Sequence, residues 1–225
     1  MTLTLMDWFH EEMPDLIYAY QSQEGIAADG TPVPSGGGLI NLGKDVRIPV
    51  KPNTTYYVHV ICPGSYPGHA WIFEDHPMTT VEIDGVYVEP VLVNVGDQQV
   101  RMAPGQRQGV LITTKSTTDR NYAIFDALDA NALFRYKGIS PPSDYPFNTT
   151  AWLVYDDNAP LLPAPDIQKL GEEYFFDDVN YVSLDGEPAL EPVDHQIILE
   201  TVAANISGIS RYLSQSLFSF LHLGL

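Results

Sequence analysis

The residues of this sequence best suited to chemistry are a cysteine, two histidines and a methionine. They are His59, Cys62, His69 and Met78. A blue-copper centre takes two histidines, a cysteine thiolate and often a methionine, so these residue types point to copper. Their spacing argues against it, because residues 59 and 62 of the strand-like stretch YVHVIC point to opposite faces. We expect no copper site here, with Cys62 a small buried apolar residue and His69 a turn residue.

Other catalytic and metal-binding patterns are absent from the sequence. It contains no C-x-x-C, H-E-x-x-H or G-x-S-x-G motif, and SGGG at 35–38 lacks the lysine of a phosphate-binding loop. Several acids have the chemistry to bind a cation, although most are better explained as solvated charge. They are Asp126, Asp129, Glu172, Glu173, Asp177 and Asp178. We therefore predict no catalytic residue and no metal ligand in this chain.

Composition limits the partners of the protein. The chain has 225 residues, 44% of them hydrophobic, which is enough for one large β domain or one domain and part of a second. Its net charge is −18, and phosphate binding needs clustered Lys and Arg, so nucleic acid and anionic membranes are poor partners for it. The charge suits a metal cation or a basic protein surface, or it only keeps a secreted protein soluble. Cys62 is the sole cysteine, so no internal disulfide forms.

Three glycosylation sequons indicate an extracellular protein. They begin at Asn53, Asn148 and Asn205. The N-terminal stretch MTLTLMDWFHEE lacks the basic segment and long apolar run of a secretory signal, and no apolar run reaches the length of a membrane span. We expect an extracellular or cell-surface parent protein, of which this chain, with no signal peptide, is a piece.

Short alternating stretches predict an all-β domain over residues 1–160, a sandwich or barrel. The expected strands lie at 2–9, 39–41, 45–52, 54–62, 70–74, 78–83, 85–95, within 98–115, and at 121–128 and 150–157. In the strand at 78–83 and just after it, alternation places Thr80, Glu82 and Asp84 on one face and Val81 and Ile83 on the other. Residues 11–23, EEMPDLIYAYQSQ, fall in a short helical or irregular excursion.

The remainder of the chain is predicted to be a linker and an incomplete second β unit. The Pro-rich stretch APLLPAP, 159–165, leads into the linker, 161–193, which holds a short helix with Asp166 as its N-cap. The stretch HQIILETV, 195–202, is expected to open a further β unit over 194–213 and to lack partners. Residues 214–225 are a divergent tail, either a C-terminal helix or translated non-coding sequence.

The order of motifs along the chain resembles the second cupredoxin domain of a fungal multicopper oxidase. The branch it resembles holds iron-uptake ferroxidases and pigment-type laccases. The likeness covers residues 1–165 and continues weakly through 194–213. The motifs are LTLMDWFHEE at 3–12, LIN at 39–41, TTYYVHVIC at 54–62, FEDHPMTTVEIDGVYVEP at 73–90, APGQRQGVLITT at 103–114 and YAIFDALD at 122–129.

This resemblance implies a Greek-key cupredoxin sandwich without copper. In the family, copper lies in the first and third domains, on His-x-His pairs and a His-Cys-His segment, and none of these patterns occurs here. The parent would oxidise phenols or Fe(II) and reduce O2 to water. This domain would space the flanking copper domains and form part of the substrate-pocket wall. His76 would be structural, bridging two strands through side-chain hydrogen bonds.

The acids that hold Fe(II) in ferroxidases are only partly present. Asp129 matches one of them and is our candidate for the pocket wall, but Thr31 and Phe134 stand where two other acids are expected. These departures favour a laccase-like parent that oxidises phenols. Two other readings stay open: a non-catalytic extracellular binding module with a cupredoxin fold, and an acidic cation-binding protein.

Overall fold

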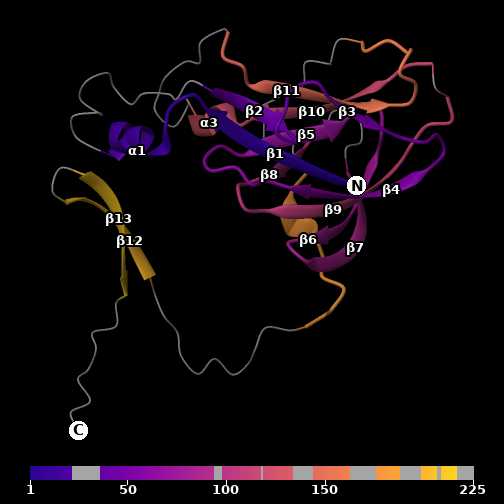
Figure 1. Ribbon diagram of the computed structural model, residues 1–225. Helices are drawn as coiled ribbons and strands as arrows, with labels where there is room; N and C mark the ends of the chain where they lie inside the picture. The colour runs from indigo at the N-terminus through magenta and orange to yellow at the C-terminus, as the bar shows by residue number, and fades with distance from the viewer. Residues whose placement is uncertain are drawn as a thin grey trace. The chain divides into compact units, whose positions relative to one another are not determined.

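The computed structural model describes residues 1–21, 36–93, 98–117, 119–133, 144–162, 176–187, 199–206 and 209–216 (Figure 1). The chain divides into two compact units. The first comprises Met1–Phe9 and Ser35–Gly186, and the second comprises His10–Pro34 and Glu187–Leu225. The first unit contains nearly all of the predicted strands.

One layer of the first unit is a six-stranded sheet in the order β2-β1-β4-β9-β6-β7. Its strands are β1 (Thr2–Phe9), β2 (Gly36–Ile40), β4 (Thr55–Ile61), β6 (Met78–Ile83), β7 (Val86–Val93) and β9 (Arg107–Thr113). Neighbouring strands are antiparallel except for β1 and β4, which are parallel. Most of these strands are rich in β-branched and aromatic residues, which favour a pleated, half-buried surface.

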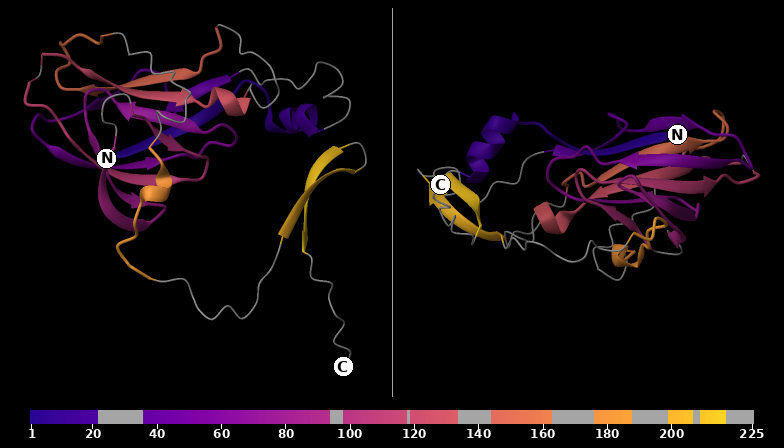
Figure 2. Two further views of the ribbon diagram at one scale, coloured as in Figure 1. Left: turned by 180° about the vertical axis from the view of Figure 1, so that it is seen from behind. Right: turned by 90° about the horizontal axis from the view of Figure 1, so that it is seen from below.

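The facing layer is a five-stranded sheet in the order β3-β11-β10-β5-β8. Its strands are β3 (Val46–Pro49), β5 (His69–Phe73), β8 (Val100–Met102), β10 (Tyr122–Leu128) and β11 (Asn148–Val154), and the short helix α3 (Ala130–Leu133) follows β10. Figure 2 shows the two layers from behind and from below. The predicted all-β sandwich is confirmed.

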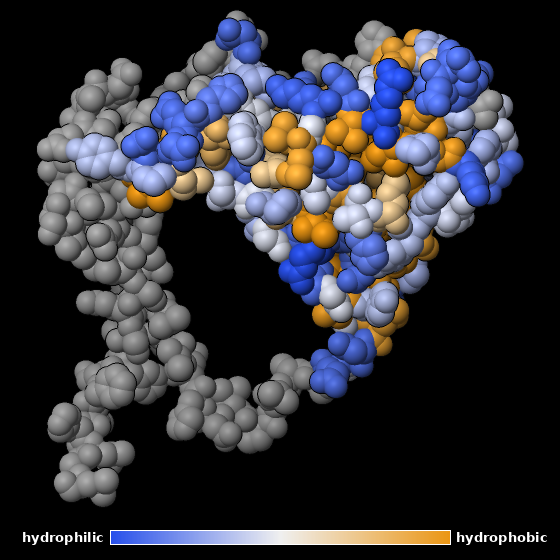
Figure 3. Space-filling model, viewed as in Figure 1, coloured by the Kyte–Doolittle hydropathy of each residue, from blue (hydrophilic) through white to orange (hydrophobic). Residues whose placement is uncertain are grey.

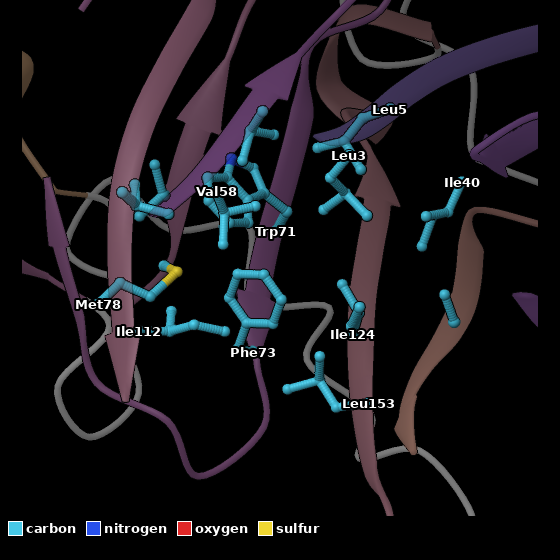
Figure 4. Close-up of a cluster of buried hydrophobic side chains, with 14 of the residues drawn as sticks. Leu3, Leu5, Ile40, Val58, Trp71, Phe73, Met78, Ile112, Ile124 and Leu153 are labelled. Atoms are coloured by element: carbon cyan, nitrogen blue, oxygen red, sulfur yellow. The ribbon is translucent and has the colours of Figure 1, made fainter. Parts of the chain in front are cut away.

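The core lies between the two sheets and follows the alternation of the strands. In β1, Leu3 and Leu5 point inward and are fully buried, while their neighbours are partly or fully exposed. Each buried side chain of this size stabilises the fold by roughly 1.5–3 kcal/mol relative to an exposed one. The labelled core residues in Figure 4 are Leu3, Leu5, Ile40, Val58, Trp71, Phe73, Met78, Ile112, Ile124 and Leu153.

Residues 176–186 form a strap along the outer edge of the six-stranded sheet. Glu89 donates its backbone N–H to Val182 at 2.8 Å, and Leu184 donates to Tyr87 at 2.9 Å. This pairing covers part of the open edge of β7, as edge strands commonly require. The strap differs from the linker that the sequence led us to expect over 161–193.

The helix expected from Asp166 falls largely on residues outside the described ranges. The part that is described contains a short 3-10 helix, Asp178–Asn180, with Asp177 as its N-cap. In the strap before and after this turn, Phe176 packs against the core, and the Tyr181 hydroxyl lies 3.3 Å from Thr80 Oγ1.

The second unit contains the helix α1 (Met13–Gln21) and a hairpin of β12 (Leu199–Ile206) and β13 (Ile209–Ser216). The expectation that the strand near 195–202 has no partner is wrong, because β12 pairs with β13 along its whole length. The predicted start of the tail at residue 214 is also too early, because residues 214–216 belong to β13. Residues 217–225 lie outside the described ranges. In the described part of the chain, no helix has the length and apolarity needed to cross a bilayer.

Candidate functional site

The four candidate copper ligands do not converge. His59 is exposed on β4 and Cys62 is fully buried just beyond it, which confirms that the two point to opposite faces. Met78 lies in the core on β6. The sequence-based expectation that His69 is a turn residue is wrong, because His69 begins β5 and is fully buried.

His69 forms a buried pair with Asp126 of the neighbouring strand β10. Its Nδ1 lies 3.0 Å from Asp126 Oδ1 and 2.9 Å from Oδ2, and both side chains are fully buried. Burial alone would lower the pKa of His69, but the Asp126 carboxylate overrides it and raises the pKa to about 10. Burial raises the pKa of Asp126, and His69 opposes that rise. We conclude that the pair holds its proton at neutral pH as imidazolium and carboxylate.

The other ring nitrogen of His69 faces the loop that connects β4 to β5. The Cys62 thiol lies close enough to contribute to the raised pKa of His69. In the same loop, Ser65 donates its backbone N–H and its hydroxyl to the Asp7 carboxylate at 2.6 and 2.7 Å. Gly64 is required there, because a Cβ would collide with Asp7 Oδ1. These contacts join the loop to both sheets, so we assign them to stabilising the fold.

Copper does not fit the residues that the structure describes. Among them, no three His, Cys, Asp or Glu side chains gather in a way that could hold a metal ion. Type 1 copper needs two histidines and a thiolate converging on one point. Of the histidines near Cys62, His59 points outward and His69 is bound to Asp126 through Nδ1. No copper chemistry is therefore assigned to this chain.

His76 connects the ends of two strands of the five-stranded sheet. Its Nδ1 lies 2.5 Å from the carbonyl oxygen of Glu74, after β5, and its Nε2 lies 2.6 Å from the hydroxyl of Tyr155, after β11. Burial lowers the pKa of His76. The predicted bridging role is confirmed. Sequence reasoning missed Tyr155 as the partner, because the two residues are 79 positions apart.

A β-bulge in β6 changes the face on which its residues lie. Thr80 pairs with Val110 and Glu82 with Gly109, so the register shifts between them. Thr80 is fully buried, whereas Glu82 is partly exposed on the outer face. The prediction that Thr80 and Glu82 share a face is therefore wrong, because one extra residue reverses the alternation.

The outer face of the six-stranded sheet carries a polar cluster around Gly109. The Tyr57 hydroxyl crosses β9 to donate a short hydrogen bond to Glu82, and the ring of His59 packs edge-on against Tyr57 at 4.5 Å. A Cβ at Gly109 would collide with the Tyr57 hydroxyl, so glycine is needed for this close approach. Burial and the Glu82 carboxylate raise the pKa of Tyr57.

Asp129, the predicted pocket-wall residue, is largely buried at the start of α3. Its Oδ2 accepts a hydrogen bond from Arg101 Nη2 at 2.5 Å, and its Oδ1 accepts one from the backbone N–H of Ala132 at 3.3 Å. Its role in a pocket stays a prediction. Thr31 and Phe134, the two departures from the ferroxidase pattern, lie outside the described residues.

Two of the three predicted glycosylation sites have exposed side chains, and the third is described only in its backbone. Asn53 is exposed in the turn between β3 and β4 and has a left-handed backbone, with φ of 47°. Asn148 is exposed at the first position of β11. Asn205 lies in β12, where only the backbone is described. Attachment of glycans stays a prediction for all three.

Comparison with known proteins connects this architecture to one family. A family model described as "Multicopper oxidase" matches residues 1–158. The chain is 32% identical over 206 residues to the iron transport multicopper oxidase fetC of Epichloe festucae, covering 92% of this chain and 31% of that protein. It is 29% identical to the iron transport multicopper oxidase FET3 of Saccharomyces cerevisiae, covering 94% of this chain and 31% of that protein. The chain thus spans about a third of the length of these curated relatives.

Solved structures agree with the sequence relatives. The crystal structure of Fet3p, titled as a multicopper oxidase that functions in iron import, superposes with a TM-score of 0.81 at 27% identity, covering 95% of this chain and 38% of that one. A laccase from Botrytis aclada matches with a TM-score of 0.53 at 16% identity, covering 95% of this chain and 39% of that one, and supports the fold alone. The two-sheet sandwich, the family model and the sequence relatives together show that this chain belongs to the multicopper oxidase family.

Proposed function

We propose that this chain is the middle cupredoxin domain of a copper-dependent oxidase, with the first strands of the domain that follows. The observation that carries the proposal is the match to Fet3p over 95% of this chain but only 38% of that one, on a domain whose described residues offer no copper ligand set. Its role is to hold the copper-bearing domains at the correct spacing. The chain by itself should catalyse no oxidation.

Several apolar side chains are exposed on the sandwich. Trp8, Leu42 and Tyr87 are 53%, 74% and 63% exposed, and Leu92 is also exposed. Figure 3 shows hydrophobic residues interspersed with hydrophilic ones on one face of the sandwich. Apolar side chains that are exposed singly among polar ones are normal on protein surfaces, so they do not by themselves mark an interface.

The substrate of the parent oxidase is a small one-electron reductant, Fe(II) or a phenol. Curated relatives are named for iron transport, which favours Fe(II). Thr31 and Phe134 replace two acids of the ferroxidase pattern, which favours phenols. Asp129 is the residue of this domain that we place at the pocket wall.

The absence of bound copper is tested directly by metal analysis. The chain, equilibrated with Cu(II) and then dialysed, should stay colourless and retain less than one copper per molecule, because its histidines are spread singly along the sequence. Cys62→Ser serves as the control and should behave like the unaltered chain. A blue absorption band that Cys62→Ser abolishes would show that Cys62 ligates type 1 copper, and the proposal would fail.

Secretion and glycosylation of the parent are part of the same proposal. Expressed behind a secretory signal in a fungal host, the chain should carry glycan at Asn53 or Asn148, whose side chains are exposed. Gel mobility before and after glycosidase treatment measures this. Thr55→Ala destroys the first sequon and should remove glycan from Asn53, whereas Thr55→Ser preserves the sequon and should keep the glycan. In the second sequon, Thr150→Ala should remove glycan from Asn148 and Thr150→Ser should keep it. Unchanged mobility of the unaltered chain would count against glycosylation.

A further inference from the structure

A tyrosine and a histidine with a fixed hydrogen-bond direction lie at the ends of β11 and β5. The His76 Nδ1 faces the carbonyl oxygen of Glu74 at 2.5 Å. A carbonyl oxygen only accepts, so Nδ1 carries the hydrogen and donates it. In the neutral imidazole, Nε2 is then an acceptor, and the Tyr155 hydroxyl, 2.6 Å away, donates to it.

The surroundings of this pair favour transfer of a proton from the Tyr155 hydroxyl to His76 Nε2. His76 is almost completely buried, and burial lowers its pKa, so the ring is neutral and its Nε2 accepts the hydrogen bond from Tyr155. The backbone N–H of Lys115 donates to the Tyr155 oxygen at 2.8 Å. That bond holds the oxygen in place whether or not it carries its hydrogen.

A second tyrosine packs against both members of the pair. The Tyr122 ring centroid lies 4.9 Å from His76 and 5.5 Å from Tyr155. Two cations lie over this ring, with Arg120 at 4.3 Å and Lys115 at 5.4 Å from its centroid. A nearby cation raises the free energy of a positive charge on the ring, so an electron is harder to remove from Tyr122 than from Tyr155.

We propose that Tyr155 and His76 form a one-electron redox site that takes up oxidising equivalents from small radicals such as phenoxyl radicals. Tyr155 gives one electron to the oxidant while its O–H bond breaks and an N–H bond forms at His76 Nε2. The products are a neutral Tyr155 radical, the His76 imidazolium and the oxidant reduced by one electron. When an electron returns, the proton crosses back to the Tyr155 oxygen.

Among the described residues, the main competitor is Tyr57, whose hydroxyl donates to an ionisable side chain. Tyr181 also donates to a side chain, but its acceptor, Thr80 Oγ1, is a hydroxyl oxygen. Tyr57 donates to Glu82, but both of these side chains are partly exposed, whereas His76, the acceptor of Tyr155, is almost completely buried. The proton that Tyr155 gives up on oxidation is therefore better shielded from water than that of Tyr57. Tyr57→Phe provides a matched control, and Tyr87→Phe removes a phenol that is 63% exposed.

The test is photo-oxidation of the full chain with photogenerated tris(bipyridine)ruthenium(III), followed by electron paramagnetic resonance of freeze-quenched samples. We expect a long-lived tyrosyl signal that Tyr155→Phe removes and that Tyr57→Phe and Tyr87→Phe retain. Tyr155→Phe keeps the ring and its packing, so its fold should persist, as near-UV circular dichroism will check. His76→Gln should shorten the lifetime of the signal.

One arm of the test needs no variant. In the unaltered chain, formation of the signal should be slower in D2O than in H2O, because the O–H bond breaks as the electron leaves. Persistence of the long-lived signal in Tyr155→Phe, its loss in Tyr57→Phe, or equal rates in H2O and D2O would each overturn the proposal.

Discussion

Replacing Asp126 with alanine is expected to lower the free energy of unfolding by about 3–5 kcal/mol, the largest single-residue effect that we predict for this domain. Asp126 and His69 are both fully buried, and the carboxylate is the charge that keeps the imidazolium stable. Without it, His69 must either keep an uncompensated buried charge or lose its proton and a hydrogen-bond partner. Urea denaturation of the chain, followed by tryptophan fluorescence, measures the loss.

An exposed ion pair offers a matched control. Asp84 lies 3.2 Å from Arg107, with the two side chains 42% and 51% exposed. Asp84→Asn removes the charge but keeps the Oδ1 that accepts the Arg107 backbone N–H, and it should cost at most about 1 kcal/mol, because solvent screens an exposed pair. The double variant His69→Leu with Asp126→Leu should lose less stability than Asp126→Ala, since it leaves no unpaired charge. If Asp126→Ala costs no more than Asp84→Asn, the pair is not the buried ion pair that we describe.

Local patterns in the sequence were sufficient to predict most of the sandwich. The stretch MTTVEI gives β6 with its bounds, and TLTLMDWF gives β1, because alternation and β-branched residues are properties of neighbouring positions. The burial of Cys62 and the exposure of His59 follow from the same alternation. The family resemblance supplied the cupredoxin topology, which alternation alone does not specify.

The features that were missed depend on residues far apart in the sequence. His69 and Asp126 are 57 positions apart and meet only because β5 and β10 pair in the sheet. The bulge at Thr80 is invisible to a strict period of two, and it moved Glu82 to the opposite face. Likewise, the strap over 176–186 is held by backbone hydrogen bonds with β7. Backbone pairing of this kind cannot be predicted from the pattern of side chains along the sequence.

A three-domain chimera should restore an activity that the isolated chain lacks. Residues 1–186 would replace the corresponding segment between the first and third domains of a relative such as the FET3 oxidase of Saccharomyces cerevisiae, with which the chain shares 29% identity. If this domain sets the spacing of the copper-bearing domains, the chimera should bind copper and consume O2. The same relative with its middle segment deleted should do neither, because its copper domains are no longer held together.

The central claim is most directly tested by O2 consumption of this chimera, measured with an oxygen electrode under saturating Fe(II) and, separately, a phenol. The account predicts turnover with at least one of these reductants, dependent on copper and absent from both the isolated chain and the deletion control. A chimera that is soluble and folded, yet consumes no O2 with either reductant after copper loading, would contradict the assignment of this chain as the middle domain of a multicopper oxidase.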